Sequence, residues 1–80
     1  MIIVGWPDCD TCNILKEMYP NLDYIEITPV SKDARVRKIK KLIGKHGLDY
    51  FPLLVNDEIT EFIPMKNLDP KFAKEHPKLY

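Results

Sequence analysis

Two cysteines, Cys9 and Cys12, are the only ones in the chain, and two residues separate them. A single Cys-x-x-Cys motif near a strand-helix-strand pattern is typical of a redox pair, in which one sulfur attacks a disulfide and the other resolves the product. A disulfide that closes so short a loop stabilises a fold by only about 2 kcal/mol. The spacing therefore predicts thiol-disulfide exchange rather than a structural cross-link.

The alternative for this pair is a metal site. Zinc would need two further ligands, from His46 and His76 or from carboxylates. Each histidine is isolated, and thirty positions separate them. We therefore favour redox chemistry and predict no bound metal.

The segments around the cysteines decide what each sulfur can do. Residues 1 to 5 are apolar and β-branched and end in the turn sequence Gly-Trp-Pro-Asp, which predicts a buried strand. Apolar positions then recur at helical spacing from residue 10 to residue 19, and Pro20 ends this helix. Cys9 thus lies where a strand turns into a helix.

A helix N-terminus stabilises an anion and lowers the pKa of a thiol from its ordinary value of about 8.5. We therefore expect Cys9 to be the nucleophile and Cys12, one turn further along, to be the shielded resolving thiol. Asp8 and Asp10 flank the nucleophile, and their charge opposes the thiolate. Lys16 compensates in part if its ammonium reaches back toward the sulfur.

The middle of the chain predicts a second strand and a second helix. Residues 23 to 28 alternate between polar and apolar, which indicates a strand that pairs in parallel with the first. Ser31 is a suitable N-cap for the following helix, Asp33 suits its first turn, and Gly44 is expected to end it.

The last third predicts a hairpin and a short helix. Residues 51 to 55 and 58 to 62 form the two strands, joined by a tight turn at Asn56 and Asp57. Asp69 followed by Pro70 is the start of a short helix. The expected order is β-α-β-α-β-β-α, an α/β fold with one four-stranded mixed sheet flanked by helices.

Composition places all of this in one small domain, residues 1 to 80. The chain is 45% hydrophobic and carries 12 basic and 12 acidic side chains. Its longest apolar runs, residues 1 to 4 and 51 to 55, are far shorter than the roughly 20 residues that span a bilayer. No secretory signal is recognisable at the N-terminus. We expect a cytoplasmic monomer without a membrane partner.

The charges are unevenly distributed along the chain. Residues 32 to 45 hold seven basic side chains and one acidic one, a net charge of +6, while the remainder carries −6. Such asymmetry can indicate an acidic partner or nucleic acid. Because the total charge is zero, we favour a solvated helix face, and nucleic acid is not an expected partner.

With these residues in view, the chain resembles a small glutaredoxin-like redoxin of the thioredoxin superfamily. The resemblance covers about residues 1 to 64 and rests on the first strand, the segment Pro7-Asp8-Cys9-Asp10-Thr11-Cys12, Lys16, and the segment Phe51-Pro52-Leu53-Leu54-Val55 before an acidic turn. It implies a cis proline at Pro52 that faces the disulfide, and a Phe51 backbone that pairs with an extended substrate. Trp6 is expected to pack beside the site and to contribute to partner docking.

The sequence departs from glutathione-using glutaredoxins at two places. A Gly-Gly pair followed by an acidic residue is expected after the fourth strand, but residues 62 to 66 read Phe-Ile-Pro-Met-Lys. The lysine common before the Cys-x-x-Cys loop is replaced by Gly5-Trp6-Pro7. These departures weigh against glutathione and leave the electron donor open between glutathione and thioredoxin reductase.

We therefore predict a dithiol-disulfide oxidoreductase without a tightly bound cofactor. Its partners would be a disulfide-containing protein substrate, with ribonucleotide reductase as one candidate, and an upstream reductase. The alternative function is a non-catalytic binding protein of the same fold that holds an acidic partner or nucleic acid on its basic second helix.

Overall fold

The computed structural model describes residues 1–79. Its elements follow one another in the order β1 (Ile2–Gly5), α1 (Asp10–Met18), β2 (Asp23–Glu26), α2 (Ala34–His46), β3 (Leu53–Val55), β4 (Phe62–Ile63), a 3-10 turn (Met65–Asn67), α3 (Pro70–Glu75) and a second 3-10 turn (Pro77–Leu79). The expected α/β fold with one four-stranded mixed sheet is confirmed.

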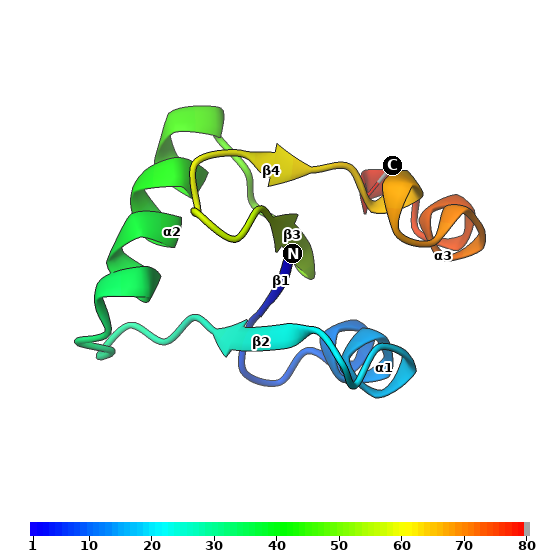
Figure 1. The fold of residues 1–80 in the computed structure, drawn as a ribbon, viewed down its shortest axis with the longest axis horizontal. Coiled ribbons are helices and arrows are strands. Elements are labelled where there is room, and N and C mark those ends of the chain that lie inside the picture. Colours follow the sequence, from blue (N-terminus) through cyan, green and yellow to red (C-terminus); the bar gives the residue numbers. More distant parts are fainter. Residues whose placement is uncertain (80) are drawn as a thin grey trace.

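The sheet has the strand order β2-β1-β3-β4 and separates two layers of helices. Figure 1 shows α2 on one side of the sheet and α1 with α3 on the other. β1 pairs in parallel with β2 and antiparallel with β3, and β3 pairs antiparallel with β4. The carboxyl ends of β1 and β2 therefore meet at one edge, which carries the cysteines.

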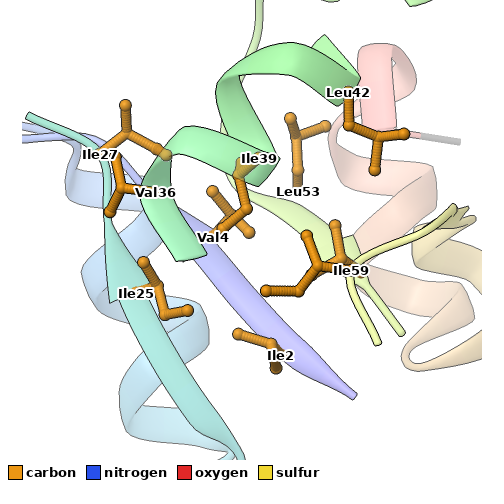
Figure 2. Close-up of a cluster of buried hydrophobic side chains, with 10 residues drawn as sticks. Ile2, Val4, Ile25, Ile27, Val36, Ile39, Leu42, Leu53 and Ile59 are labelled. Atoms are coloured by element: carbon orange, nitrogen blue, oxygen red, sulfur yellow. The ribbon is translucent and has the colours of Figure 1, made fainter. Parts of the chain in front are cut away.

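Alternation along the strands divides the core into two clusters. Ile25 and Ile27 join the cluster beneath α2, whereas Tyr24 turns to the opposite face, as the period-two pattern of β2 predicts. Figure 2 shows the α2-side cluster, against which Phe62 of β4 also packs. Its buried members are Ile2, Val4, Ile25, Ile27, Val36, Ile39, Leu42, Leu53, Val55 and Ile59.

Helix α2 differs from the prediction at both ends. Asp33, not Ser31, is the N-cap, because its carboxylate accepts the N–H of Arg35 at 2.8 Å, while Ser31 accepts the N–H of Asp33. The helix continues through Gly44 to His46, and Gly47 is its C-cap, with the left-handed φ of 64° that glycine adopts readily. Gly44 does not stop the helix. It lies on the exposed face, and the last turn is closed beyond it, where the N–H groups of Gly47 and Leu48 donate to the carbonyl of Ile43 and Leu48 packs against the core.

The predicted hairpin is present with a shorter second strand. β4 contains only Phe62–Ile63, and residues 56 to 61 form a wide turn instead of a two-residue one. Asn56 holds this turn, since its side-chain oxygen accepts the N–H of Thr60 and of Glu61. Ile59 is buried within the turn at a φ of 55°, so its side chain packs under α2 instead of continuing a strand.

The N-terminus of α3 is confirmed as predicted. Asp69 is the N-cap, and its carboxylate accepts the N–H of Phe72 at 3.0 Å, with Pro70 in the first turn. The hydroxyl of Tyr19, at the end of α1, donates to the same carboxylate at 2.9 Å. This bond joins the two helices that cover the cysteine side of the sheet.

Candidate active site

Cys9 is the N-cap residue of α1. Its backbone is extended, with φ −104° and ψ 102°, and its sulfur accepts the backbone N–H of Cys12 at 3.1 Å. Its carbonyl oxygen accepts the N–H of Asn13 and so begins the helical ladder. An N-cap side chain normally takes this bond with an oxygen. Here the group that receives the N–H is the reactive atom itself.

The two cysteines form a disulfide but differ in exposure. Their Cα atoms are 5.2 Å apart, within the usual range for a disulfide. Cys9 is half-buried, whereas Cys12 has no exposed surface and lies beneath the first turn of α1. Cys9 therefore keeps surface that a molecule in solution can reach, whereas Cys12 has none.

The charged neighbours of Cys9 are partly as predicted. Asp8 and Asp10 are exposed on either side of it, and Asp8 adopts a left-handed φ of 61°, which aspartate tolerates better than most residues. Lys16 differs from the expectation. Its ammonium lies 4.8 Å from the centre of the Tyr24 ring, a cation–π contact, so the structure directs this charge to Tyr24.

Three predicted substrate-contacting residues lie near one another. Trp6 stacks on Phe51, with ring centres 5.6 Å apart and planes 26° apart, and 42% of Trp6 is exposed. This contact joins the loop before the cysteines to the loop before β3. Pro52 is fully buried and follows a cis peptide bond, as the resemblance implies.

A small hollow next to the motif was not predicted from the sequence. Its volume is about 260 Å³, and Thr11, between the two cysteines, forms part of its wall. The remaining lining comes from the loop before β3 and from the C-terminal turns, namely Tyr50, Phe51, Glu75, His76, Pro77 and Lys78. No pattern in residues 75 to 78 indicated this, because only the tertiary fold brings them to the motif.

A larger hollow of about 510 Å³ lies between the C-terminal end of α2 and β4. It is lined by His46, Leu48, Tyr50, Pro52, Leu53, Leu54, Glu61, Phe62, Ile63, Pro64 and Met65. His46 lies at its rim with its ring edge toward Phe62, 5.7 Å between centres. Neither cysteine lines this hollow, so we do not assign it to the disulfide.

Tyr24 and Gly5 form a further pair that sequence patterns did not single out. The Tyr24 hydroxyl is buried without a hydrogen-bond partner and lies where a Cβ on Gly5 would be. Burial, and secondarily the charge of Glu26, raises the pKa of Tyr24. Gly5 therefore leaves room for the tyrosine directly before the loop that carries Cys9.

Residues 1–79 contain no group of three or more His, Cys, Asp or Glu side chains arranged to hold a metal ion. No helix in this part of the chain has the length and apolar character needed to cross a membrane.

Comparisons with known proteins do not place this chain in a family. None of the protein-family models, curated proteins or solved structures with which it was compared matches it. We therefore infer the function of this chain from its own geometry.

Proposed function

We propose that the protein is a small thiol-disulfide oxidoreductase that passes electrons to protein disulfides through Cys9 and Cys12. The observation that carries the proposal is the unequal placement of the two sulfurs. Cys9 is accessible at the N-cap of α1, where a backbone N–H already points at its sulfur, and Cys12 is buried one turn behind it. One sulfur is thus positioned to attack and the other to resolve.

The exchange proceeds in two steps. The Cys9 thiolate attacks one sulfur of the target disulfide, a mixed disulfide forms, and the first target thiolate leaves and takes a proton. Cys12, as its thiolate, then attacks the sulfur of Cys9, and the second target thiolate leaves. The target gains two electrons and two protons, and the Cys9–Cys12 pair is oxidised to the disulfide present in the structure.

The Cys12 N–H stabilises the attacking form of Cys9. It donates to the sulfur at 3.1 Å, and the dipole of α1 acts in the same direction. When Cys12 later attacks, the sulfur of Cys9 is bonded to the target in the mixed disulfide and no longer carries a negative charge. The helix start therefore favours the reduced, reactive state of Cys9.

Substrate recognition in this proposal involves the aromatic pair and Pro52. The exposed Trp6 ring, stacked on Phe51, offers an apolar surface to a docking protein. By resemblance, the backbone beside Pro52 would pair with an extended target segment. The interaction would be brief, since each target must leave after reduction.

The fold is consistent with a glutaredoxin-like member of the thioredoxin superfamily. The support is the β-α-β-α-β-β-α order and the position of the motif at the end of β1. The oxidised pair would be restored by an upstream reductase, either thioredoxin reductase or a glutathione system, and ribonucleotide reductase is one candidate target.

Reduction of insulin disulfides tests the proposal. We expect the wild type to accelerate reduction with at least one donor, either thioredoxin reductase with NADPH or glutathione with its reductase. Cys9→Ser should abolish the acceleration, and Lys71→Gln, on the exposed surface of α3, should preserve it. Equal rates for the wild type and Cys9→Ser with both donors would contradict the proposal and leave a binding function as its rival.

A further inference from the structure

Helix α2 is cationic throughout its exposed surface. It carries two arginines and four lysines and no acidic residue. All six cations are exposed, namely Arg35, Arg37, Lys38, Lys40, Lys41 and Lys45. The buried side of the helix consists of Val36, Ile39 and Leu42, which pack on the sheet (Figure 2). The charges therefore occupy the side that faces away from the protein.

Helical geometry aligns half of these charges into a row. Arg37, Lys41 and Lys45 are four residues apart, so they follow one another along one face at a spacing of about 6 Å. Lys38 lies beside this row, one position from Arg37 in sequence and three from Lys41. The result is a continuous basic surface along the length of α2, which we call the α2 basic surface and define by these four residues.

The α2 basic surface is not neutralised by the rest of the described chain. The ion pair formed by this helix joins Arg35 to Asp33 at 3.5 Å, outside the row. Lys38 reaches only a backbone carbonyl oxygen, that of Glu58, at 3.5 Å. Within residues 1–79, Arg37, Lys41 and Lys45 have no carboxylate partner. Like charges at these spacings repel one another, so the surface weakens the isolated helix.

The zero net charge of the whole chain does not cancel this surface for a molecule that touches it. Charges are screened over about 8 to 10 Å at physiological salt, whereas the molecule measures 33 × 23 × 21 Å. A partner on α2 therefore meets the local charge of the helix. The acidic side chains beyond that distance contribute little.

The surface lacks what a protein partner would need. The cores of protein interfaces are apolar, and lysine is depleted from them, but the four residues of the α2 basic surface are lysine and arginine. Among residues 1–79, the exposed large hydrophobic residues are Trp6, Ile14, Met18 and Val30, and none of them belongs to α2. The affinity must therefore come from charge alone, which is the case for a regularly charged phosphate backbone.

The lack of exposed aromatic side chains on α2, apart from His46, favours a duplex over a single strand. Proteins that bind single strands stack bases on exposed aromatic side chains. Helix α2 contains no aromatic residue other than His46 at its C-terminal end. A row of cations without a stacking platform fits the phosphates of a duplex.

We propose that the α2 basic surface binds the phosphate backbone of duplex nucleic acid without sequence specificity. The surface lies on the opposite side of the sheet from α1 and α3 (Figure 1). The nucleic acid therefore leaves Cys9 accessible, and the proposal stands or falls separately from the redox function. It describes a protein held on nucleic acid while its disulfide faces solution.

Fluorescence anisotropy with a labelled DNA duplex of roughly 20 base pairs tests the proposal, with salt varied from about 50 to about 200 mM. We expect Arg37→Gln with Lys41→Gln and Lys45→Gln to weaken binding at least about tenfold at the lower salt concentration. The slope of log Kd against log salt should fall by about 2 to 3, as expected for three lost phosphate contacts.

The matched control removes three cations from the opposite layer, by Lys71→Gln, Lys74→Gln and Lys78→Gln. It has the same net charge as the α2 variant and should change Kd less than about twofold. Circular dichroism of both variants confirms that they are folded. No binding by the wild type at low salt, or equal weakening in both variants, would overturn the proposal. Tighter binding to poly-glutamate than to the duplex would overturn it in favour of an acidic protein.

Discussion

The hydroxyl of Tyr24, on β2, occupies the space in which any residue other than glycine at position 5 would place its Cβ. Gly5 is the last residue of β1 and is buried. The ammonium of Lys16, on α1, lies over the ring of the same tyrosine, 4.8 Å from its centre. A strand end, a neighbouring strand and the cysteine-bearing helix therefore meet at one tyrosine.

Gly5→Ala should lower the free energy of unfolding by about 1 to 3 kcal/mol, because the new methyl group overlaps the Tyr24 side chain. Tyr24→Phe removes a buried hydroxyl that has no partner, so its stability should be unchanged or slightly higher. The double variant should recover part of the loss. Urea unfolding of the four proteins measures this coupling, and strictly additive effects would show that the two residues do not meet.

Asp8 and Asp10 should restrain the reactivity of Cys9, because their charges oppose the thiolate that the helix start stabilises. Asp8→Asn with Asp10→Asn should raise the alkylation rate of Cys9 at neutral pH by about two- to fivefold. Glu58→Gln with Glu61→Gln makes the same charge change in the turn at the far end of the sheet and serves as the control. Equal rates in the two double variants would show that the aspartates point away from the sulfur.

The hydrogen bond from the Tyr19 hydroxyl to the Asp69 carboxylate, which joins α1 and α3, should make the free energy of unfolding depend on pH in the acid range. The Phe72 N–H and the Tyr19 hydroxyl lower the pKa of Asp69 below its ordinary value of 3.8. A carboxylate with a lowered pKa stabilises the fold above its unfolded-state pKa, and this stabilisation disappears as pH falls through the folded-state pKa. The destabilisation caused by Asp69→Asn should therefore be full at neutral pH and shrink below about pH 3.8.

Tyr19→Phe provides an internal check on this account, because it removes one of the hydrogen bonds that lower the pKa of Asp69. Its acid transition should begin at a higher pH than that of the wild type. Thermal unfolding followed by circular dichroism across the acid range measures both variants. A constant difference between Asp69→Asn and the wild type at every pH would contradict the assignment.

Repulsion within α2 predicts that a charge reversal stabilises the protein. Lys41 has three like-charged neighbours, Arg37, Lys38 and Lys45. Lys41→Glu turns the three repulsions into attractions and should raise the free energy of unfolding by about 1 kcal/mol at low salt. Lys41→Gln should give about half of that gain, and both gains should shrink in high salt. If Lys41→Gln is no more stable than the wild type at low salt, the repulsion is negligible.

Local chemistry made much of this fold predictable. The helix start at Asp69-Pro70 and the strand-to-helix turn at Cys9 depend on capping by residues that are adjacent in sequence, so sequence patterns predict them. The placement of Ile25 and Ile27 follows from alternation alone. The expectation that Gly44 ends α2 was wrong. The packing of the apolar side of the helix stabilises it by more than a glycine on the exposed face destabilises it.

The residues that the sequence did not reveal depend on long-range packing. Ile59 takes a left-handed conformation so that its side chain can be buried under α2, which no turn pattern indicates. Nothing in the sequence distinguishes Tyr24 from an ordinary strand residue, because its close approach to Gly5 arises only when β1 and β2 pair. Thr11 lines one hollow with Glu75 and His76 only because the fold brings the C-terminal turns beside the motif. Each of these contacts joins segments that lie far apart in sequence.

The most direct test of the redox account is a trapping experiment with single-cysteine variants. Each is reduced, mixed with an insulin disulfide substrate, quenched in acid and analysed by mass spectrometry. Cys12→Ser should accumulate a mixed disulfide through Cys9, because its attacking sulfur is accessible and no resolving thiol remains. Cys9→Ser should trap almost none, since Cys12 is buried. Trapping through Cys12 at an equal or faster rate, or no mixed disulfide with Cys12→Ser, would contradict the account.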